Sequence, residues 1–221
     1  MYDPDRHHRR SRRRPGFNYT QTAAYFVTLC ACDRSCLFGA VKDDIVGLNA
    51  YGTAVQDAWH ESETVRQEIV LDAFVIMPNH LHGIVLIVPP DAEGDLHDPR
   101  GYRLDRKDGA ASVRRAHGHA PLQDGNLGTK NDEITSTPVG AHGGAPSLHR
   151  APRSLGSFVA GFKTAATTGI NRLRGTPGAP VWQRNYHDRI LRDEREWRAC
   201  RQYIHDNPAR WAHDQLNPKH R

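Results

Sequence analysis

The chain has 221 residues, with 30 Lys or Arg against 25 Asp or Glu, so its formal net charge at neutral pH is +5. Hydrophobic residues make up 38% of it and the mean hydropathy is −0.70, which is low for a chain that packs along its whole length. No apolar run reaches the roughly 18 residues of a membrane-spanning helix, and no apolar segment completes a secretory signal. We therefore expect a soluble, cytoplasmic protein with no membrane partner, whose basic charge favours an anionic partner such as nucleic acid.

The basic charge is concentrated at the N-terminus, before Pro15 and Gly16. The arginines expected to contact DNA there are Arg9, Arg10, Arg12, Arg13 and Arg14. An arm of this composition is also typical of a solvated, disordered tail, and the two interpretations are compatible. We assign residues 1–15 to this arm, residues 16–214 to a single catalytic domain and residues 215–221 to a C-terminal tail.

The first half of the domain contains three strands and a helix in the predicted order. The segment 24–31 is rich in β-branched and aromatic residues and predicts a buried strand. Apolar residues at helical spacing predict a helix over about 43–63, with Asp43 and Asp44 at its N-terminus. Two further strands are predicted at 69–77 and 83–88, joined through the turn-forming pair Pro78-Asn79.

The pattern then breaks down between about residues 90 and 152, a Gly- and Pro-rich stretch that we expect to be a flexible, disordered insertion. Regular periodicity returns with a helix at about 154–175, a strand at 181–191 and a last helix at about 193–207, which Pro208 should end. The order β, α, β, β, α, β, α predicts an α+β protein with a ferredoxin-like, split βαβ antiparallel sheet and helices on one face.

Two histidines lie one residue apart in the run Met77-Pro78-Asn79-His80-Leu81-His82-Gly83. Side chains alternate along a strand, so His80 and His82 should project side by side from one face. Such a pair is either a hydrogen-bonded surface pair or the start of a metal site. The flanking apolar strands favour the metal site, because an unpaired polar group is costly there. We expect Mg²⁺ or Mn²⁺ with open positions for phosphate oxygens.

A second pair of polar residues lies on the last predicted helix. Tyr203 and Asn207 are four residues apart and so should neighbour one another. Tyr203 is either a residue at the edge of the core or a nucleophile, and Asn207 either ends the helix or supplies a third metal ligand. A phenol with a pKa near 10 needs a cation or a base nearby to attack at neutral pH.

Four segments together resemble the HUH single-tyrosine transposases, in particular the REP-associated branch, which is IS200-like. They are Tyr25-Phe26-Val27-Thr28, the histidine run, Val181-Trp182-Gln183 and Tyr203-Ile204-His205-Asp206-Asn207-Pro208. The resemblance covers roughly residues 16–90 and 152–214. It implies that His80, His82 and Asn207 hold a divalent metal while Tyr203 attacks single-stranded or hairpin DNA. The attack leaves a 5′-phosphotyrosine bond and a free 3′-hydroxyl that permits strand transfer.

Two other functions are compatible with the sequence. One is a domesticated, non-catalytic DNA-binding protein of the same fold, and the other is a metal phosphoesterase in which Tyr203 is structural. The later arginines line either the path of the DNA strand or a solvated face: Arg184, Arg189, Arg192, Arg198 and Arg201. The resemblance favours a monomer, with a homodimer as the alternative.

Overall fold

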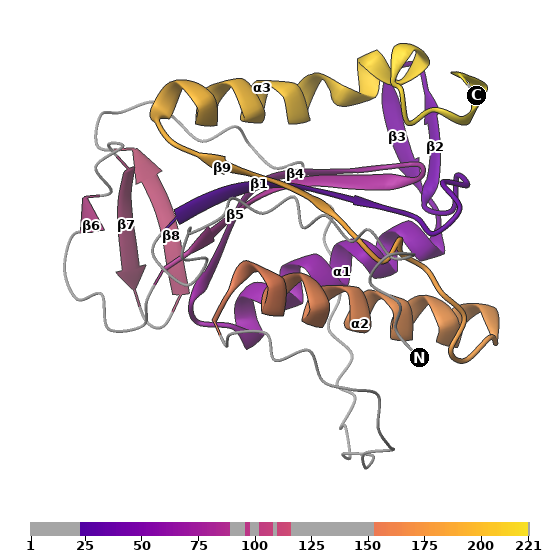
Figure 1. Ribbon diagram of the computed structural model, residues 1–221, viewed down its shortest axis with the longest axis horizontal. Helices are drawn as coiled ribbons and strands as arrows, with labels where there is room; N and C mark the ends of the chain where they lie inside the picture. The colour runs from indigo at the N-terminus through magenta and orange to yellow at the C-terminus, as the bar shows by residue number, and fades with distance from the viewer. Residues whose placement is uncertain (1–22, 89–95, 98–101, 108–109, 116–152, 221) are drawn as a thin grey trace, which may run out of the picture.

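The computed structural model describes residues 23–88, 96–97, 102–107, 110–115 and 153–220 (Figure 1). Within them the backbone forms three α-helices, three sheets and two short 3₁₀ turns. The strands are β1 (Ala23–Cys30), β2 (Gly39–Lys42), β3 (Ile45–Leu48), β4 (Ile69–Met77), β5 (His80–Ile87), β6 (Leu96–His97), β7 (Tyr102–Lys107), β8 (Ala110–Arg115) and β9 (His187–Leu191). The helices are α1 (Ala50–Val65), α2 (Leu155–Arg174) and α3 (Glu194–Arg210), followed by the turns η1 (Trp211–His213) and η2 (Pro218–His220).

The central sheet has four strands in the order β4-β5-β1-β9, and each pair of adjacent strands is antiparallel. The β2–β3 hairpin and helix α1 lie between β1 and β4 in the chain, and α2 lies between β5 and β9. Each of these helices thus links two strands that are not adjacent in the sheet, which is the split βαβ arrangement. The prediction of an α+β protein with a ferredoxin-like antiparallel sheet is confirmed.

The helices occupy both faces of the sheet, whereas the sequence predicted them on one. Helices α1 and α2 lie on one face and α3 lies on the other (Figure 1). Right-handed crossovers place α1 and α2 together, while α3 follows the last strand and is free to fold back over the opposite face. Every residue of β5 is buried, so its two faces both need a cover.

The helix predicted from about residue 43 begins later, because residues 39–48 form the β2–β3 hairpin. Asp43 and Asp44 have φ values of +50° and +60° and make the tight turn of this hairpin. Asp is among the few residues that tolerate this left-handed region, and both central residues of a type I′ turn need it. Helix α1 instead starts after Asn49, whose side chain accepts hydrogen bonds from the backbone N–H groups of Tyr51 and Gly52.

The last strand and the last helix also differ from their predicted bounds. Of the predicted strand at 181–191, only β9 joins the sheet, and Trp182 forms an isolated bridge to Ala31. Helix α3 continues through Pro208 to Arg210. Proline keeps a helical φ and removes only one N–H, and the final turn closes through the Trp211 N–H to the Pro208 carbonyl.

The insertion expected at about 90–152 is described only in part. Strands β6, β7 and β8 form a small antiparallel sheet within it, which the sequence did not predict. The remaining residues of this segment and the whole arginine arm lie outside the described residues.

Two apolar clusters hold the layers together. Under α1 and α2, aromatic rings pack edge to face around Trp59, whose ring centroid lies 5.6 Å from that of Phe158 and 5.2 Å from that of Phe162. Gly83 of β5 faces this cluster: a Cβ there would come within 2.6 Å of the Trp59 ring. On the other face, Trp197, Cys200 and Ile204 of α3 pack against the sheet. The Trp59 ring thus leaves no space for a side chain at Gly83, the residue that follows the His-x-His pair.

Candidate metal site and tyrosine

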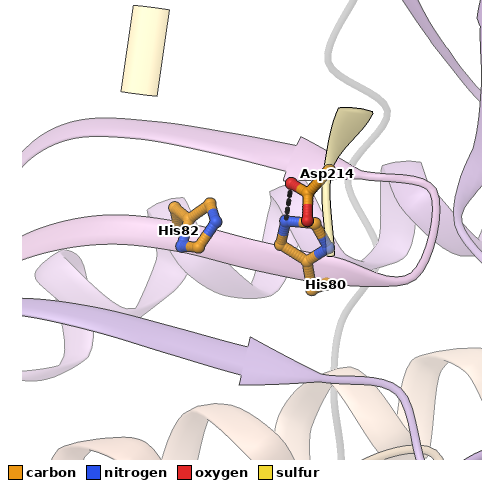
Figure 2. A group of neighbouring side chains, drawn as sticks. All are labelled: His80, His82 and Asp214. Atoms are coloured by element: carbon orange, nitrogen blue, oxygen red, sulfur yellow. Dashed lines mark ion pairs between the residues drawn. The ribbon is translucent and has the colours of Figure 1, made fainter. Parts of the chain in front are cut away.

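His80 and His82 project from the α3 side of β5, as the strand alternation predicts. Both are buried, at 0% and 3% exposure, and their ring centroids lie 4.6 Å apart. Figure 2 shows the two rings side by side, with the carboxylate of Asp214 beside His80. The turn at Pro78-Asn79 ends β4 and begins β5 with His80, so the pair lies at one end of the sheet.

The two ring nitrogens of His80 have different surroundings. Its Nδ1 lies 2.8 Å from the amide oxygen of Asn79. Its Nε2 is buried and has no hydrogen-bond partner among the described residues. The nearest carboxylate oxygen, Oδ2 of Asp214, lies 3.9 Å from this Nε2. A buried nitrogen with no partner beside a carboxylate is an arrangement that a bound cation would satisfy.

His82 connects the sheet to α3. Its Nδ1 lies 2.9 Å from the hydroxyl oxygen of Thr28, which is the directly opposite residue on β1. Its Nε2 lies 3.4 Å from the hydroxyl of Tyr203. The ring of Phe26 stacks on the His82 ring at a centroid distance of 5.3 Å, and it also contacts Tyr203 edge-on. These contacts fix the His82 ring between β1 and α3.

Burial keeps both histidines neutral at physiological pH. It lowers the pKa of His80 to about 4. The pKa of His82 falls to about 3, chiefly through burial and further through the neighbouring His80, with Asp214 acting in the opposite direction. A neutral imidazole is the form that binds a metal. Both imidazoles therefore have the protonation state that metal ligation requires across the physiological pH range.

Tyr203 lies on α3 with its side chain 37% exposed. The pKa of its phenol is raised by burial and then by the negative charge of Asp214, against smaller opposite effects of Asn207 and Arg210. These surroundings thus disfavour the phenolate. A cation held by the neighbouring histidines would offset this effect, since positive charge favours the ionised phenol.

Helix α3 is anchored by a half-buried carboxylate on the sheet. Asp72, beside an irregularity in β4, accepts a hydrogen bond of 2.6 Å from Nε1 of Trp197. Its other oxygen lies 3.2 Å from the guanidinium of Arg201. Trp197 and Arg201 are one turn apart on α3, and Arg201 lies two residues before Tyr203. Asp72 therefore fixes the position of the helix close to Tyr203.

Asp214 was not predicted from the sequence, and it completes a group of three ligand-type side chains with His80 and His82. One ligand atom from each of His80, His82 and Asp214 lies within 4.8 Å of the others. Asp214 follows η1, where the chain turns back after α3 and covers the histidines. A single Asp in a polar C-terminal stretch carries no motif, so only the fold brings it to the site.

Asn207, the predicted third ligand, lies one helical turn from Tyr203 and is 1% exposed. Its Oδ1 is buried and has no hydrogen-bond partner among the described residues. The structure therefore brings together His80, His82 and Tyr203, and it adds Asp214. The role of Asn207 as a ligand stays a prediction.

The predicted DNA-contacting arginines, Arg9 to Arg14, lie outside the described residues. Three of the later arginines form ion pairs with carboxylates: Arg189 with Glu196, Arg198 with Glu194 and Arg201 with Asp72. The pairs of Arg189 and Arg198 are consistent with a solvated face, whereas Arg201 pairs with the half-buried carboxylate that anchors α3. In the part of the chain that the structure describes, no helix is both long and apolar enough to cross a membrane.

Fold and site together define an α+β protein with a ferredoxin-like sheet and a His-His-Asp cluster beside a helical tyrosine. No family model matches the sequence. An uncharacterised protein of Haemophilus influenzae strain Rd is 30% identical over 215 residues, which cover 97% of this chain and 96% of that protein. The chain belongs to the same family as this protein.

Two solved structures show a remote likeness. One is a REP-associated tyrosine transposase bound to a REP hairpin, with 14% identity and a TM-score of 0.46 over 91% of this chain and 74% of that one. The other is a candidate transposase of Deinococcus radiodurans R1, with 12% identity and a TM-score of 0.39 over 89% of this chain and 97% of that one. Neither likeness transfers an activity to this chain.

Proposed function

We propose that this chain is a metal-dependent HUH tyrosine transposase. It would bind hairpin or single-stranded DNA, cleave it with Tyr203 and transfer the cleaved strand. The single observation that carries the proposal is the 3.4 Å distance between the Tyr203 hydroxyl and Nε2 of His82. It joins a candidate nucleophile on α3 to a candidate metal site on β5.

The donor set fits a divalent cation. Two neutral imidazoles from β5 and one carboxylate from the segment after η1 come together, and the buried Nε2 of His80 has no hydrogen-bond partner among the described residues. We propose Mn²⁺ or Mg²⁺, and the imidazoles favour Mn²⁺, because Mg²⁺ is usually bound through oxygen alone. When bound, such an ion would polarise a phosphate oxygen and neutralise charge that develops there.

The chain's own residues would perform one displacement. The phenolic oxygen of Tyr203 attacks the phosphorus of a DNA phosphodiester and loses its proton to solvent. A bond forms between this oxygen and the 5′-phosphate, the bond to the 3′-oxygen breaks, and the 3′-hydroxyl leaves after taking up a proton. The linkage keeps the phosphodiester energy, so another 3′-hydroxyl can reverse the step and join strands without a nucleotide cofactor.

The basic balance of the chain supports a nucleic-acid partner, because Lys and Arg near phosphates release condensed counterions. In this proposal the positive charges of Arg9, Arg10, Arg12, Arg13 and Arg14 increase the affinity for DNA. The metal site itself holds phosphate and reads no sequence. The proposed assembly is a monomer.

The test is covalent trapping. The protein is incubated with a 3′-labelled single-stranded oligonucleotide that contains a hairpin, with Mn²⁺ or Mg²⁺, and separated under denaturing conditions. We expect a labelled protein–DNA adduct in the wild type and in Tyr51→Phe, a control in α1 on the opposite face. The adduct should be absent in Tyr203→Phe and in His80→Gln.

Other outcomes would support other functions. Metal-dependent cleavage that survives Tyr203→Phe without an adduct would indicate a phosphoesterase. DNA binding without cleavage under either metal would indicate a non-catalytic binding protein. Either result would overturn the transposase proposal.

A further inference from the structure

We infer that Asn79 is a positioning residue that couples the ion site to the chain segment carrying Asp214. The inference rests on the proposed metal site and adds a residue that does not itself bind the ion. One buried amide would hold the His80 ring in the form needed for ligation and would also hold residues 211–217 against it.

The orientation of the Asn79 amide is fixed by its partners. Asn79 is 1% exposed. Its Nδ2 donates to the Arg34 carbonyl at 2.8 Å and to the Leu216 carbonyl at 2.7 Å. Carbonyl oxygens only accept, so the NH₂ group must be the atom that faces them. The remaining atom, Oδ1, is therefore the one that faces Nδ1 of His80 at 2.8 Å.

This orientation determines the tautomer of His80. An amide oxygen only accepts, so Nδ1 must carry the proton and donate it to Asn79. The neutral ring then has its lone pair on Nε2, which lies 3.9 Å from Oδ2 of Asp214. The buried Nε2 and the half-buried carboxylate oxygen of Asp214, both acceptors, thus approach each other with no proton from the ring between them. A cation between them would turn this repulsion into attraction.

The same amide holds the segment that supplies the carboxylate. The Leu216 N–H donates to Oδ1 of Asp214 at 2.6 Å, while the Leu216 carbonyl accepts from Asn79. Asn217, which is buried, donates from its side chain to the Trp211 carbonyl and closes the segment on itself. Asn79 therefore connects His80 and the segment of Asp214 through one side chain. A displacement of either residue would shift the other.

The experiment uses the full chain and measures Mn²⁺ binding by calorimetry. Outer-shell partners of metal ligands typically contribute about 10–100-fold to affinity. We expect Asn79→Ala to lose affinity within that range. The matched control is Asn171→Ala, because Asn171 is also a buried amide, at 6% exposure, and donates to the Ala179 carbonyl away from the site. It should lose stability and keep Mn²⁺ affinity.

Two further readouts separate positioning from general destabilisation. Nitrogen-15 NMR of metal-free protein should show His80 protonated at Nδ1 in the wild type and in Asn79→Asp, which keeps the acceptor, and a mixture of tautomers in Asn79→Ala. In hydrogen exchange, Mn²⁺ should protect residues 211–217 of the wild type. That protection should be lost in Asn79→Asp, which lacks the donors to Leu216.

If Asn79→Ala keeps the Mn²⁺ affinity and the His80 tautomer of the wild type, the inference is overturned. The proposed metal site is not affected by that result. If Asn79→Ala does not fold, the wild type decides: Mn²⁺ must protect residues 211–217, and His80→Gln must abolish this effect. Failure of covalent trapping, in contrast, overturns the transposase proposal alone, because metal affinity, tautomer and exchange are measured without DNA.

Discussion

The side chain of Asp214 faces Nε2 of His80 at 3.9 Å, and its negative charge raises the pKa of the Tyr203 phenol. A carboxylate in this place opposes the phenolate. In the metal site that we propose, the same carboxylate would be part of the ligand set. The ionisation of Tyr203 and the proposed ion binding would thus be linked through one residue.

Replacing Asp214 by Asn should change both properties. The Mn²⁺ affinity should fall at least as much as the roughly 10–100-fold typical of an outer-shell partner. In metal-free protein the pKa of Tyr203 should fall, because a negative neighbour is removed. Calorimetry and the ultraviolet difference titration against Tyr203→Phe measure the two effects. Asp206→Asn, an equal change of charge at the surface of α3, should move neither; a Tyr203 pKa unchanged in Asp214→Asn would contradict the proposed link.

The two buried histidines should make the protein sensitive to mild acid. Their folded pKa values of about 4 and about 3 lie below the ordinary 6.5, so the unfolded chain binds protons that the folded rings reject. Their stabilising contribution is present above pH 6.5 and is lost as the pH falls toward these values. Each histidine can lower the free energy of unfolding by up to ~1.4 kcal/mol per pH unit.

Urea unfolding between pH 7 and 4 measures this dependence. A double variant with His80→Gln and His82→Gln should show a shallower decline than the wild type. His205→Gln changes an exposed histidine on α3 and should follow the wild-type curve. Parallel curves for all three proteins would mean that the rings are not kept neutral by burial.

Gly83→Ala tests the close contact between β5 and α1. The added methyl group would lie 2.6 Å from the Trp59 ring, and overpacking of this kind typically costs 1–3 kcal/mol, so we expect a loss of about that size. The matched control is Gly169→Ala in α2, where the added Cβ meets Ala54 at an ordinary 3.6 Å. It should be neutral or stabilising by about 0.5–1 kcal/mol. Thermal and urea unfolding compare the two variants, and equal effects would refute the packing argument.

Asp72 should set the position of α3. In Asp72→Ala the buried indole N–H of Trp197 loses its acceptor, which costs about 1–3 kcal/mol. Asp72→Asn keeps an acceptor and should cost less. Because α3 carries Tyr203, adduct formation should fall more in Asp72→Ala than in Asp72→Asn. An exposed ion pair on α3 supplies the control: Arg198→Ala should change unfolding by less than about 1 kcal/mol.

The strands of the central sheet were predictable because their signal is local. Alternating and continuous apolar residues define β1, β4 and β5, and the His-x-His pair falls on one face by alternation alone. The β2–β3 hairpin was not predicted, because two adjacent aspartates suit a helix N-terminus as well as a turn with positive φ. Only the backbone around Asp43 and Asp44 distinguishes the two.

The candidate site was predictable where its residues lie in motifs, and not beyond them. His80, His82 and Tyr203 come together as the combined motifs suggest. Asp214 reaches the site because the chain reverses after α3, and its placement depends on the long-range contact of Leu216 with Asn79. No spacing rule encodes such a reversal. The position of α3 on the second face of the sheet was not predicted, for a related reason. Strand β5 is buried on both sides, and its pattern does not indicate which helix covers which side.

The reversal after α3 has a consequence for biosynthesis. During synthesis the histidines leave the ribosome before the phenol of Tyr203 and the carboxylate of Asp214, because both lie far behind them in the chain. A chain that stops before α3 would contain the imidazole pair but neither Tyr203 nor Asp214. The strand cleavage that we propose would therefore require synthesis past Asp214.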